Sequence, residues 1–243
     1  MITRGKFRKF IFFILTFICI SIPAQDDNRI YFDKDWVHSD PDNAKYYLHY
    51  EIKDSVLEVS YHMASGTIFE KGQYQSPPKG TNMLEYFLNN EEQGNEVGSH
   101  FYYKKNGDIS LEVIYDPFET LDPLDKVDNN FPDSIKSRLK YEKVFFSNGN
   151  IKEEGFTIDN KSKHGQWTRY TRNGYLFFTA DFHFGKLDGK FIYYFNDGSL
   201  VEMISYKKGI KSGETIKYDL NGNPKKKIIY KEGKIITKEK LNN

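Results

Sequence analysis

Residues 165–189 read GQWTRYTRNGYLFFTADFHFGKLDG, and residues 189–213 repeat the pattern as GKFIYYFNDGSLVEMISYKKGIKSG. Both contain a glycine, an aromatic-rich run, an Asn-Gly or Asp-Gly pair, a second apolar run and more glycines. Self-similarity at a fixed period is typical of repeat architectures. Three series share a spacing of 24 residues: the pairs Asn173-Gly174, Asp197-Gly198 and Asn221-Gly222; Gly165, Gly189 and Gly213; and Gly185, Gly209 and Gly233.

Each unit reads as a β-hairpin. We expect strands at 165–170 and 176–182, a turn at 171–174, and a glycine-rich turn at 184–189 that leads into the next unit. Asn-Gly and Asp-Gly favour the type I′ turn, which needs positive φ at both central residues. Because a lone hairpin is marginal in water, neighbouring units must stack. The sequence therefore predicts an all-β fold, in which tandem hairpins of about 24 residues form an elongated antiparallel sheet.

The pattern extends toward the N-terminus with less regularity. It returns at 141–156 and 98–115, and a degenerate hairpin is expected at 56–74. Residues 116–140 hold three prolines and many acids, which predicts an inserted loop with a short helix near 134–140. We therefore divide the chain into four parts: a leader at 1–24, a lead-in with the degenerate hairpin at 25–97, an irregular repeat with an acidic insertion at 98–140, and regular repeats at 141–243.

The first 24 residues have the features of a secretory signal peptide. Four basic residues precede an apolar run at 10–22, and Pro23-Ala24 leads into polar sequence. The run is shorter than the roughly 20 residues of a membrane span. We expect cleavage after Ala24 and a protein that is exported, whether periplasmic, outer-membrane-associated or secreted, with no integral span. An uncleaved anchor is the alternative. Cys19, the only cysteine, lies in the leader, so the mature chain would have no disulfide.

Charge is unevenly distributed along the chain. The leader holds four of the 35 basic residues and none of the 34 acidic ones, so its removal leaves a net charge of −3. Residues 85–135 hold twelve acidic and three basic side chains, whereas residues 205–243 hold eleven lysines and four acids. These are solvated faces of opposite sign or an electrostatic docking surface. Nucleic acid is not an expected partner of an exported, mildly acidic protein.

The unit Gly-x-aromatic-x-x-Tyr-x-x-Asn-Gly-x-Leu, followed by Gly-x-x-x-Gly, resembles the MORN-repeat variant, a family often labelled YwqK-type antitoxin. The resemblance covers 141–236 well, and 98–115 and 56–74 less well. The stretches 31–36 and 44–47 are similar to the lead-in of exported Bacteroidetes-type members. The resemblance implies successive β-hairpins in an elongated sheet and no shared catalytic residues. It also implies scaffolding, self-association or lipid binding, and in some members an antitoxin role.

Searches for catalytic and metal-binding patterns find none that stand out. The six histidines lack metal-ligand spacing, and the acidic segment lacks the spacing of an EF-hand loop. No Gly-x-Ser-x-Gly elbow or phosphate-binding loop occurs. We therefore expect a non-enzymatic protein with no cofactor and no metal.

Two sets of residues are candidates for an interaction surface. Aromatic side chains recur at equivalent positions, where they pack the sheet or form an exposed contact row: Trp167, Tyr170, Phe191, Tyr194 and Tyr218. Lys225, Lys226 and Lys227 form a basic run. The leading hypothesis is an interaction or antitoxin/immunity-like module with an unknown protein partner. The alternative is binding of an anionic lipid or polysaccharide through the lysine-rich repeats.

Overall fold

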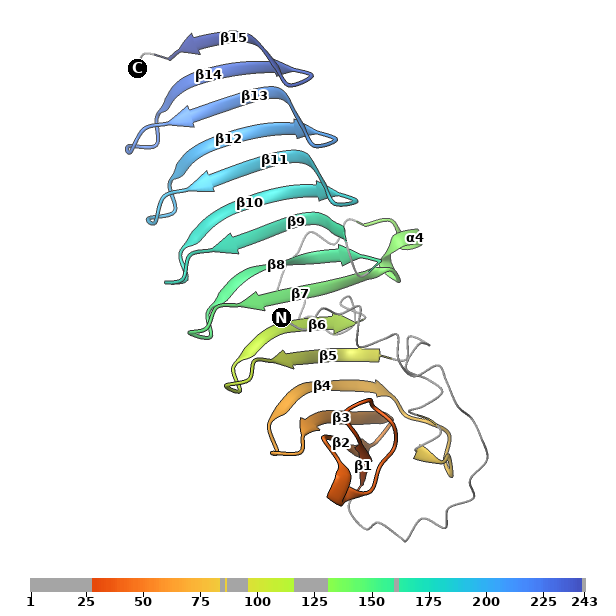
Figure 1. The fold of residues 1–243 in the computed structure, drawn as a ribbon. Helices are drawn as coiled ribbons and strands as arrows, with labels where there is room; N and C mark the ends of the chain where they lie inside the picture. Colours follow the sequence, from red (N-terminus) through yellow and green to blue (C-terminus); the bar gives the residue numbers. More distant parts are fainter. Residues whose placement is uncertain (1–27, 84–85, 87–95, 116–130, 160–161, 242–243) are drawn as a thin grey trace. The chain divides into compact units, whose positions relative to one another are not determined.

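The structure is a computed structural model, and it describes residues 28–83, 86, 96–115, 131–159 and 162–241 (Figure 1). The chain divides into two compact units, Met1–Asp108 and Ile109–Asn243. The predicted leader and residues 116–130 of the predicted insertion lie outside the described residues.

The described chain is almost entirely β-structure. Fifteen strands form one sheet in which each strand is hydrogen-bonded to its neighbours in sequence order, and the register of the pairs is antiparallel. This confirms the predicted all-β fold of successive hairpins. The strands are β1 (Arg29–Phe32), β2 (Tyr46–Lys53), β3 (Val56–Met63), β4 (Ile68–Gln75), β5 (Glu96–Tyr103), β6 (Ile109–Tyr115), β7 (Leu139–Phe145), β8 (Ile151–Ile158), β9 (Ser162–Tyr170), β10 (Leu176–His183), β11 (Lys186–Tyr194), β12 (Leu200–Lys207), β13 (Ile210–Tyr218), β14 (Pro224–Lys231) and β15 (Lys234–Lys240). Two short helices complete the set, η1 (Pro41–Asn43) and α4 (Asp133–Lys136).

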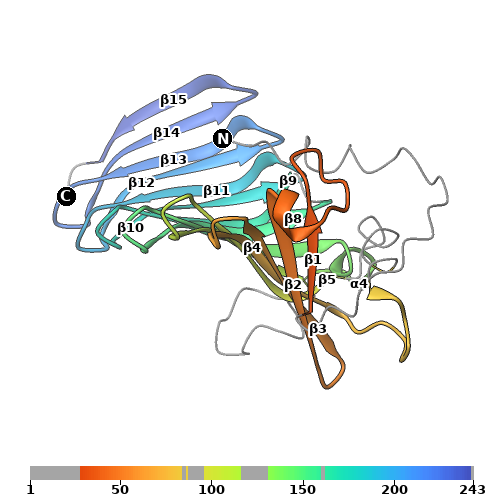
Figure 2. The ribbon, with the colours of Figure 1, turned by 60° about the horizontal axis from the view of Figure 1, so that its bottom comes forward.

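Two kinds of turn alternate along the repeats, at the two ends of the strands (Figures 1 and 2). The Asn-Gly and Asp-Gly turns are three-residue loops. In the first regular unit, the Gly174 amide donates to the Thr171 carbonyl at 3.0 Å and the Thr171 amide donates to the Tyr175 carbonyl at 2.8 Å. Gly174 has φ +86°, whereas Asn173 does not have positive φ. The type I′ prediction is therefore wrong here, because this pattern is a type I turn closed by a left-handed glycine.

The same pair of hydrogen bonds recurs at five other turns. The first residues of these turns, each of which binds both the glycine three positions on and the residue after it, are Met63, Lys104, Phe146, Phe195 and Asp219. The turn at Met63 belongs to the predicted degenerate hairpin. The repeated loop geometry therefore runs through both units and not only through the regular repeats.

The type I′ turns lie at the other end of the strands. Phe184 and Gly185 have φ +46° and +79°, and they are the whole loop between His183 and Lys186, which pair with each other. Lys208-Gly209 and Glu232-Gly233 have the same signs of φ. The prediction of a glycine-rich turn over 184–189 is thus too long, because residues 186–189 already belong to β11. Each of these glycine amides also bonds back to the preceding repeat, as Gly209 does to the Leu187 carbonyl at 2.7 Å.

A bulge interrupts the register once in each repeat. Between the pairs Ala180↔Phe191 and Phe182↔Leu187, β11 contributes two more residues than β10 does. The same excess occurs in β9 and β13, and each bulge contains a glycine of positive φ, such as Gly189 at +125°. In β15, Thr237 stands where glycine stands in the earlier repeats, and the excess is one residue. Lys238, rather than Glu239, therefore pairs with Ile228.

Side chains of directly paired residues lie on the same face of a sheet, so the register defines two rows on one face, here called the Trp167 face. The buried row is Gly155, Trp167, Ala180, Phe191, Ile204, Thr215, Ile228 and Lys238. The mixed row beside it is Glu153, Arg169, Phe178, Tyr193, Glu202, Lys217, Lys226 and Lys240. The opposite side of the sheet is called the Tyr170 face.

Each unit has its own apolar cluster. In the first unit, buried Leu48, Leu57 and Val59 pack with half-buried Trp36 and Tyr46, whose rings stack at 4.4 Å. In the second unit, the cluster on the Tyr170 face comprises Ile114, Leu139, Tyr141, Phe156 and Ile158, with Phe131 and Ile135 packed against it. Ile135 belongs to α4, which is one turn at 133–136, so the predicted helix near 134–140 is shorter than expected. It ends because Leu139 enters β7, where its side chain is buried.

Candidate interaction surface

The predicted aromatic row does not form one row in the structure. Trp167 and Phe191 lie in the buried row of the Trp167 face. Tyr170, Tyr194 and Tyr218 each follow a mixed-row residue directly and point to the Tyr170 face. The spacing of 24 residues correctly marks equivalent positions, but it does not tell which of two positions three residues apart shares a face.

Trp167 is a packing residue. Only 2% of its surface is exposed, and its ring lies so close to Gly155 that a Cβ there would meet it at 2.7 Å. The indole Nε1 donates to the Phe156 carbonyl at 2.6 Å, and the Lys163 ammonium lies 3.9 Å from the ring centroid. With its polar atom satisfied and its ring covered, Trp167 offers no surface to a partner.

The tyrosines of the Tyr170 face are also engaged within the sheet. The Tyr170 hydroxyl donates to Glu154 at 2.8 Å, and burial together with this contact raises the pKa of Tyr170 well above its usual value. The Tyr194 hydroxyl lies 3.4 Å from the Thr179 hydroxyl. Both rings are half-buried, and Tyr218 borders the depression described below.

The aromatic side chains that do gather at the surface are on the Trp167 face, over β10–β12. This aromatic patch consists of Phe177, Phe178, Phe191, Tyr193 and Tyr206. Ring centroids are 4.7 Å apart for Phe178–Phe191 and Phe191–Tyr193, and 5.8 Å apart for Phe177–Tyr193. Phe177 is 42% exposed, and the other four rings are half-buried.

Sequence reasoning missed Phe177, Phe178 and Tyr193 because it followed alternation without bulges. A register shift between Leu176 and Phe178 leaves Phe177 as the unpaired bulge residue, and the contacts of its ring place it with the patch. Equivalent shifts put Val201 and Lys225 in the same position of the next two repeats. The adjacent phenylalanines at 177 and 178 were the only available signal.

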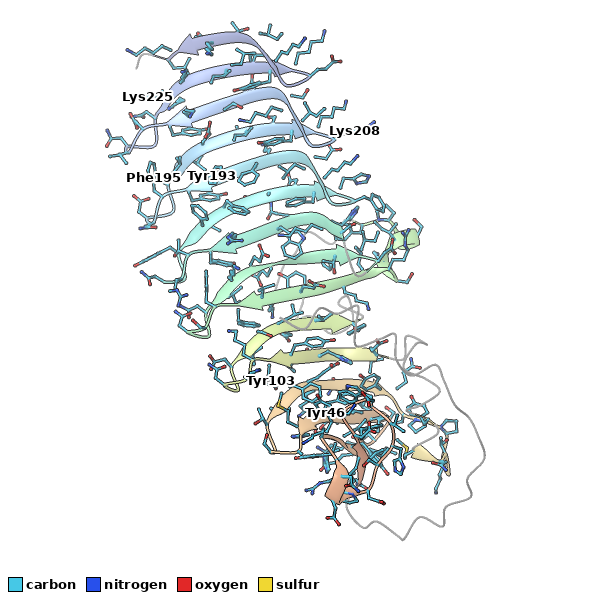
Figure 3. All side chains as sticks on the ribbon, in the orientation of Figure 1. Tyr46, Tyr103, Tyr193, Phe195, Lys208 and Lys225 are labelled. Carbon is cyan, nitrogen blue, oxygen red and sulfur yellow. The ribbon has the colours of Figure 1, made fainter. Side chains whose placement is uncertain are left out.

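The three candidate lysines separate onto two faces. Lys226 lies in the mixed row, and Lys225 is the bulge residue beside it. Lys227 points to the Tyr170 face and makes an ion pair with Glu214, which raises the pKa of Lys227 through a hydrogen bond. Figure 3 shows Lys225 and Lys208 at opposite ends of the strands, with Tyr193 toward the Lys225 end.

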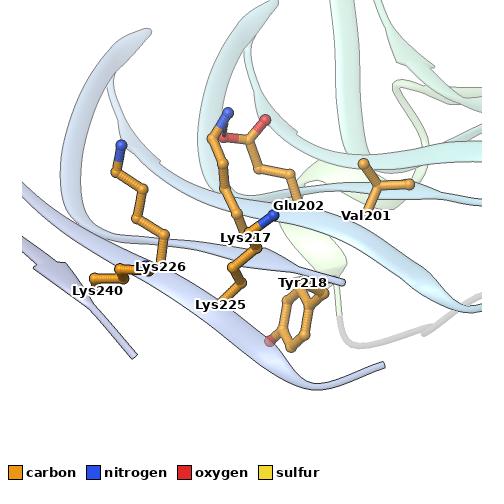
Figure 4. A pocket seen from close by; sticks show the side chains of 7 residues that line it. All are labelled: Val201, Glu202, Lys217, Tyr218, Lys225, Lys226 and Lys240. Carbon is orange, nitrogen blue, oxygen red and sulfur yellow. Dashed lines mark ion pairs between the residues drawn. The ribbon is translucent and has the colours of Figure 1, made fainter. Parts of the chain in front are cut away.

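An open depression of about 470 Å³ lies between the strands at that end (Figure 4). Its lining consists of Val201, Glu202, Lys217, Tyr218, Lys225, Lys226 and Lys240. Glu202 accepts an ion pair from Lys217 at 3.4 Å, which leaves three further ammonium groups around the same hollow.

Metal-binding and membrane-spanning features were sought over the same described ranges. No group of three or more His, Cys, Asp or Glu side chains there could hold a metal ion. None of the helices within those ranges has the length and apolar character needed to cross a membrane.

The matched units coincide with hairpins. The family described as MORN repeat variant matches residues 187–208 and 211–232. The first match spans β11 and β12, and the second spans β13 and β14. This confirms the MORN-repeat resemblance for these two units, and the YwqK-type and exported subgroups stay predictions. Repeats of this kind are generally protein- or membrane-interaction modules and are typically not enzymes.

Other comparisons add little. No curated protein matches the sequence. Among solved structures, one described as "Crystal Structure of TcdB2-TccC3" is 12% identical to this chain, with a TM-score of 0.19. The likeness covers 79% of this chain and 11% of that chain. A TM-score this low carries no argument about fold or function.

Proposed function

We propose that this chain is an exported, non-enzymatic module that binds another protein through the aromatic patch. The observation that carries the proposal is the contrast along the Trp167 face. Trp167 is covered at one end of the buried row, whereas the patch leaves Phe177 42% exposed beside half-buried Phe178 and Tyr193. Clustered aromatic side chains on a rigid sheet are suited to be binding hot spots.

The sheet supplies the rigidity that such a surface needs. Each strand of the patch is paired on both sides, since β10, β11 and β12 lie inside the order of the sheet. Aromatic rings held by cross-strand neighbours lose little conformational entropy when a partner binds. The general role of MORN-type repeats in interactions supports the same proposal.

The antitoxin or immunity-like role is the special case in which the bound protein is a toxin. Export rests on the sequence of residues 1–24. Together they would make the chain an exported protein that masks a partner outside the cytoplasm.

The alternative function is binding of an anionic lipid or polysaccharide through the lysine-rich repeats. The observation in its favour is the set of ammonium groups around the depression. It requires other residues than the aromatic patch, so substitutions separate the two functions.

A pull-down from envelope extract with residues 25–243 tests the proposal. The patch variant is Phe177→Ser/Tyr193→Ser. The matched control, Ile210→Ser/Ile236→Ser, removes two apolar side chains that are 52% and 61% exposed and lie outside the patch. We expect a discrete protein that survives high salt with the wild type and the control but not with the patch variant. Equal capture by all three proteins, or capture by none, contradicts the proposal.

A further inference from the structure

Three lysines of the mixed row lie directly opposite one another at the C-terminal end of the sheet. Lys217 on β13 pairs with Lys226 on β14, which pairs with Lys240 on β15. Like charges in directly opposed positions destabilise a sheet. Most cross-strand charges elsewhere on this face are balanced, as Glu153 is by Arg169 at 3.1 Å and Lys163 at 3.2 Å.

The chain supplies little counter-charge to this row. Lys217 is paired with Glu202, but within the described residues Lys226 and Lys240 make no ion pair. Lys225 also makes none, although it is near Asp219. The pKa of Asp219 is lowered mainly by hydrogen bonds from the Asn223 and Asn221 amides, and only weakly by Lys225. The positive potential of the depression is therefore open to an external anion.

The register of β15 increases this charge. Because the bulge in β15 has one extra residue instead of two, Lys238 and Lys240 point to the Trp167 face. Glu239 points to the other face, opposite Lys227. A glycine-containing bulge like those of β11 and β13 would have placed Glu239 opposite Ile228, as it places Phe191 and Thr215 opposite their partners.

The basic depression and the aromatic patch are continuous. Glu202, at the edge of the depression, pairs across the sheet with Tyr193 of the patch. A ligand that crosses from β15 to β10 on this face would therefore meet ammonium groups first and aromatic rings next. A peptide with carboxylates followed by apolar side chains offers both kinds of contact, whereas a polyphosphate offers only charge. A flat membrane would touch protruding side chains, but these lysines surround a hollow.

We propose that the depression lined by Lys217, Lys225, Lys226 and Lys240 binds an acidic segment of a partner protein, whose apolar side chains reach the aromatic patch. The inference rests on the proposed function and adds the chemistry of the partner. The segment lies across the strands of the Trp167 face, and its carboxylates neutralise the opposed lysines.

Fluorescence anisotropy with a labelled synthetic peptide tests the inference. The peptide alternates glutamate with serine and ends in two phenylalanines, and a second peptide lacks the phenylalanines. The binding variant is Lys225→Gln/Lys226→Gln/Lys240→Gln. The matched control, Lys208→Gln/Lys231→Gln/Lys234→Gln, removes the same charge from exposed positions at the other end of the strands. Inorganic polyphosphate and phosphatidylglycerol vesicles serve as competitors.

We expect the binding variant to weaken peptide affinity about tenfold and the control to change it about twofold or less, with both effects reduced by salt. Removal of the phenylalanines should weaken binding of the wild type but not of Phe177→Ser/Tyr193→Ser. Equal loss in both lysine variants, absence of peptide binding, or binding of only polyphosphate or vesicles overturns the inference. In each of these cases the pull-down with the patch variant still decides the proposed function separately.

Discussion

The indole of Trp167 fills the space that a side chain on Gly155 would need. A Cβ built at Gly155 would meet three ring atoms at 2.7 Å, and the ring is buried and fixed by its hydrogen bond to the Phe156 carbonyl. We predict that Gly155→Ala lowers the free energy of unfolding of the second unit by about 2–3 kcal/mol, because a packed core resists extra atoms. Urea unfolding followed by Trp fluorescence measures it.

Gly174→Ala is the control for backbone strain. Gly174 has φ +86°, but a Cβ there would meet no atom within 4 Å. Its cost should be only that of a left-handed alanine, about 1 kcal/mol. Equal losses in the two variants would show that Trp167 does not constrain Gly155.

His164 gives the second unit a pH dependence. Its ring is buried next to Phe131, His183 and Phe184, and its Nδ1 accepts the Phe184 amide hydrogen at 3.3 Å. Burial, then the charges of His183 and Arg138, lower the pKa of His164 below its ordinary value of 6.5. The unfolded chain therefore takes up a proton at a higher pH than the folded chain does.

From this sign, stability should be full above about pH 6.5 and should fall as the pH drops toward the folded pKa. His164→Phe should flatten that part of the curve, whereas His38→Asn, at an exposed site, should leave it as in the wild type. His62, whose pKa burial also lowers, keeps a smaller slope in every variant. Urea midpoints across this pH range provide the measurement, and an unchanged slope in His164→Phe would falsify the assignment.

At the scale of the elements, the two-residue turns carry residues that are not optimal for them. Lys208 has φ +50° at the first position of the Lys208-Gly209 turn, where asparagine is favoured. We predict that Lys208→Asn raises the free energy of unfolding by about 0.5–1 kcal/mol. Lys207→Asn, one residue earlier in β12, should bring no gain because asparagine is a poor strand residue. A gain in the wrong variant would contradict the turn assignment.

The turns also show how far the sequence could predict the elements. The glycine period correctly located every hairpin of the regular repeats, because glycine is needed in both kinds of turn. It assigned the type I′ geometry to the wrong one, since Asn173-Gly174 has the typical dipeptide and Phe184-Gly185 does not. Alternation failed in a similar way, because bulges at Phe177 and Lys225 shift which side chains share a face. No dipeptide rule marks such bulges in advance.

At the scale of the molecule, the repeats divide labour along one face. Trp167 closes a packed end, Phe177 and Tyr193 belong to an open aromatic patch, and Lys226 and Lys240 belong to a basic end. The sequence predicted that aromatic residues and C-terminal lysines were the candidates. It could not separate Trp167 and Lys227, which are engaged inside the protein, from Tyr193 and Lys226, because that distinction depends on cross-strand register.

Export is a prediction for the whole chain. After expression in a Gram-negative host, we expect the mature protein to begin at Gln25, because Ala24 ends the apolar leader. Intact-mass spectrometry of the periplasmic fraction and the medium measures this. A full-length mass in the membrane fraction would indicate an uncleaved anchor instead.

The most direct measurement is photo-crosslinking in the cells that make the protein. A photoreactive phenylalanine analogue replaces either Tyr193 or Tyr194, which are adjacent, equally classed as half-buried, and on opposite faces of β11. The account predicts a discrete crosslinked partner protein from position 193 and none from position 194. Crosslinks from both positions, from 194 alone, or from neither would contradict the assignment of the Trp167 face as the interaction surface.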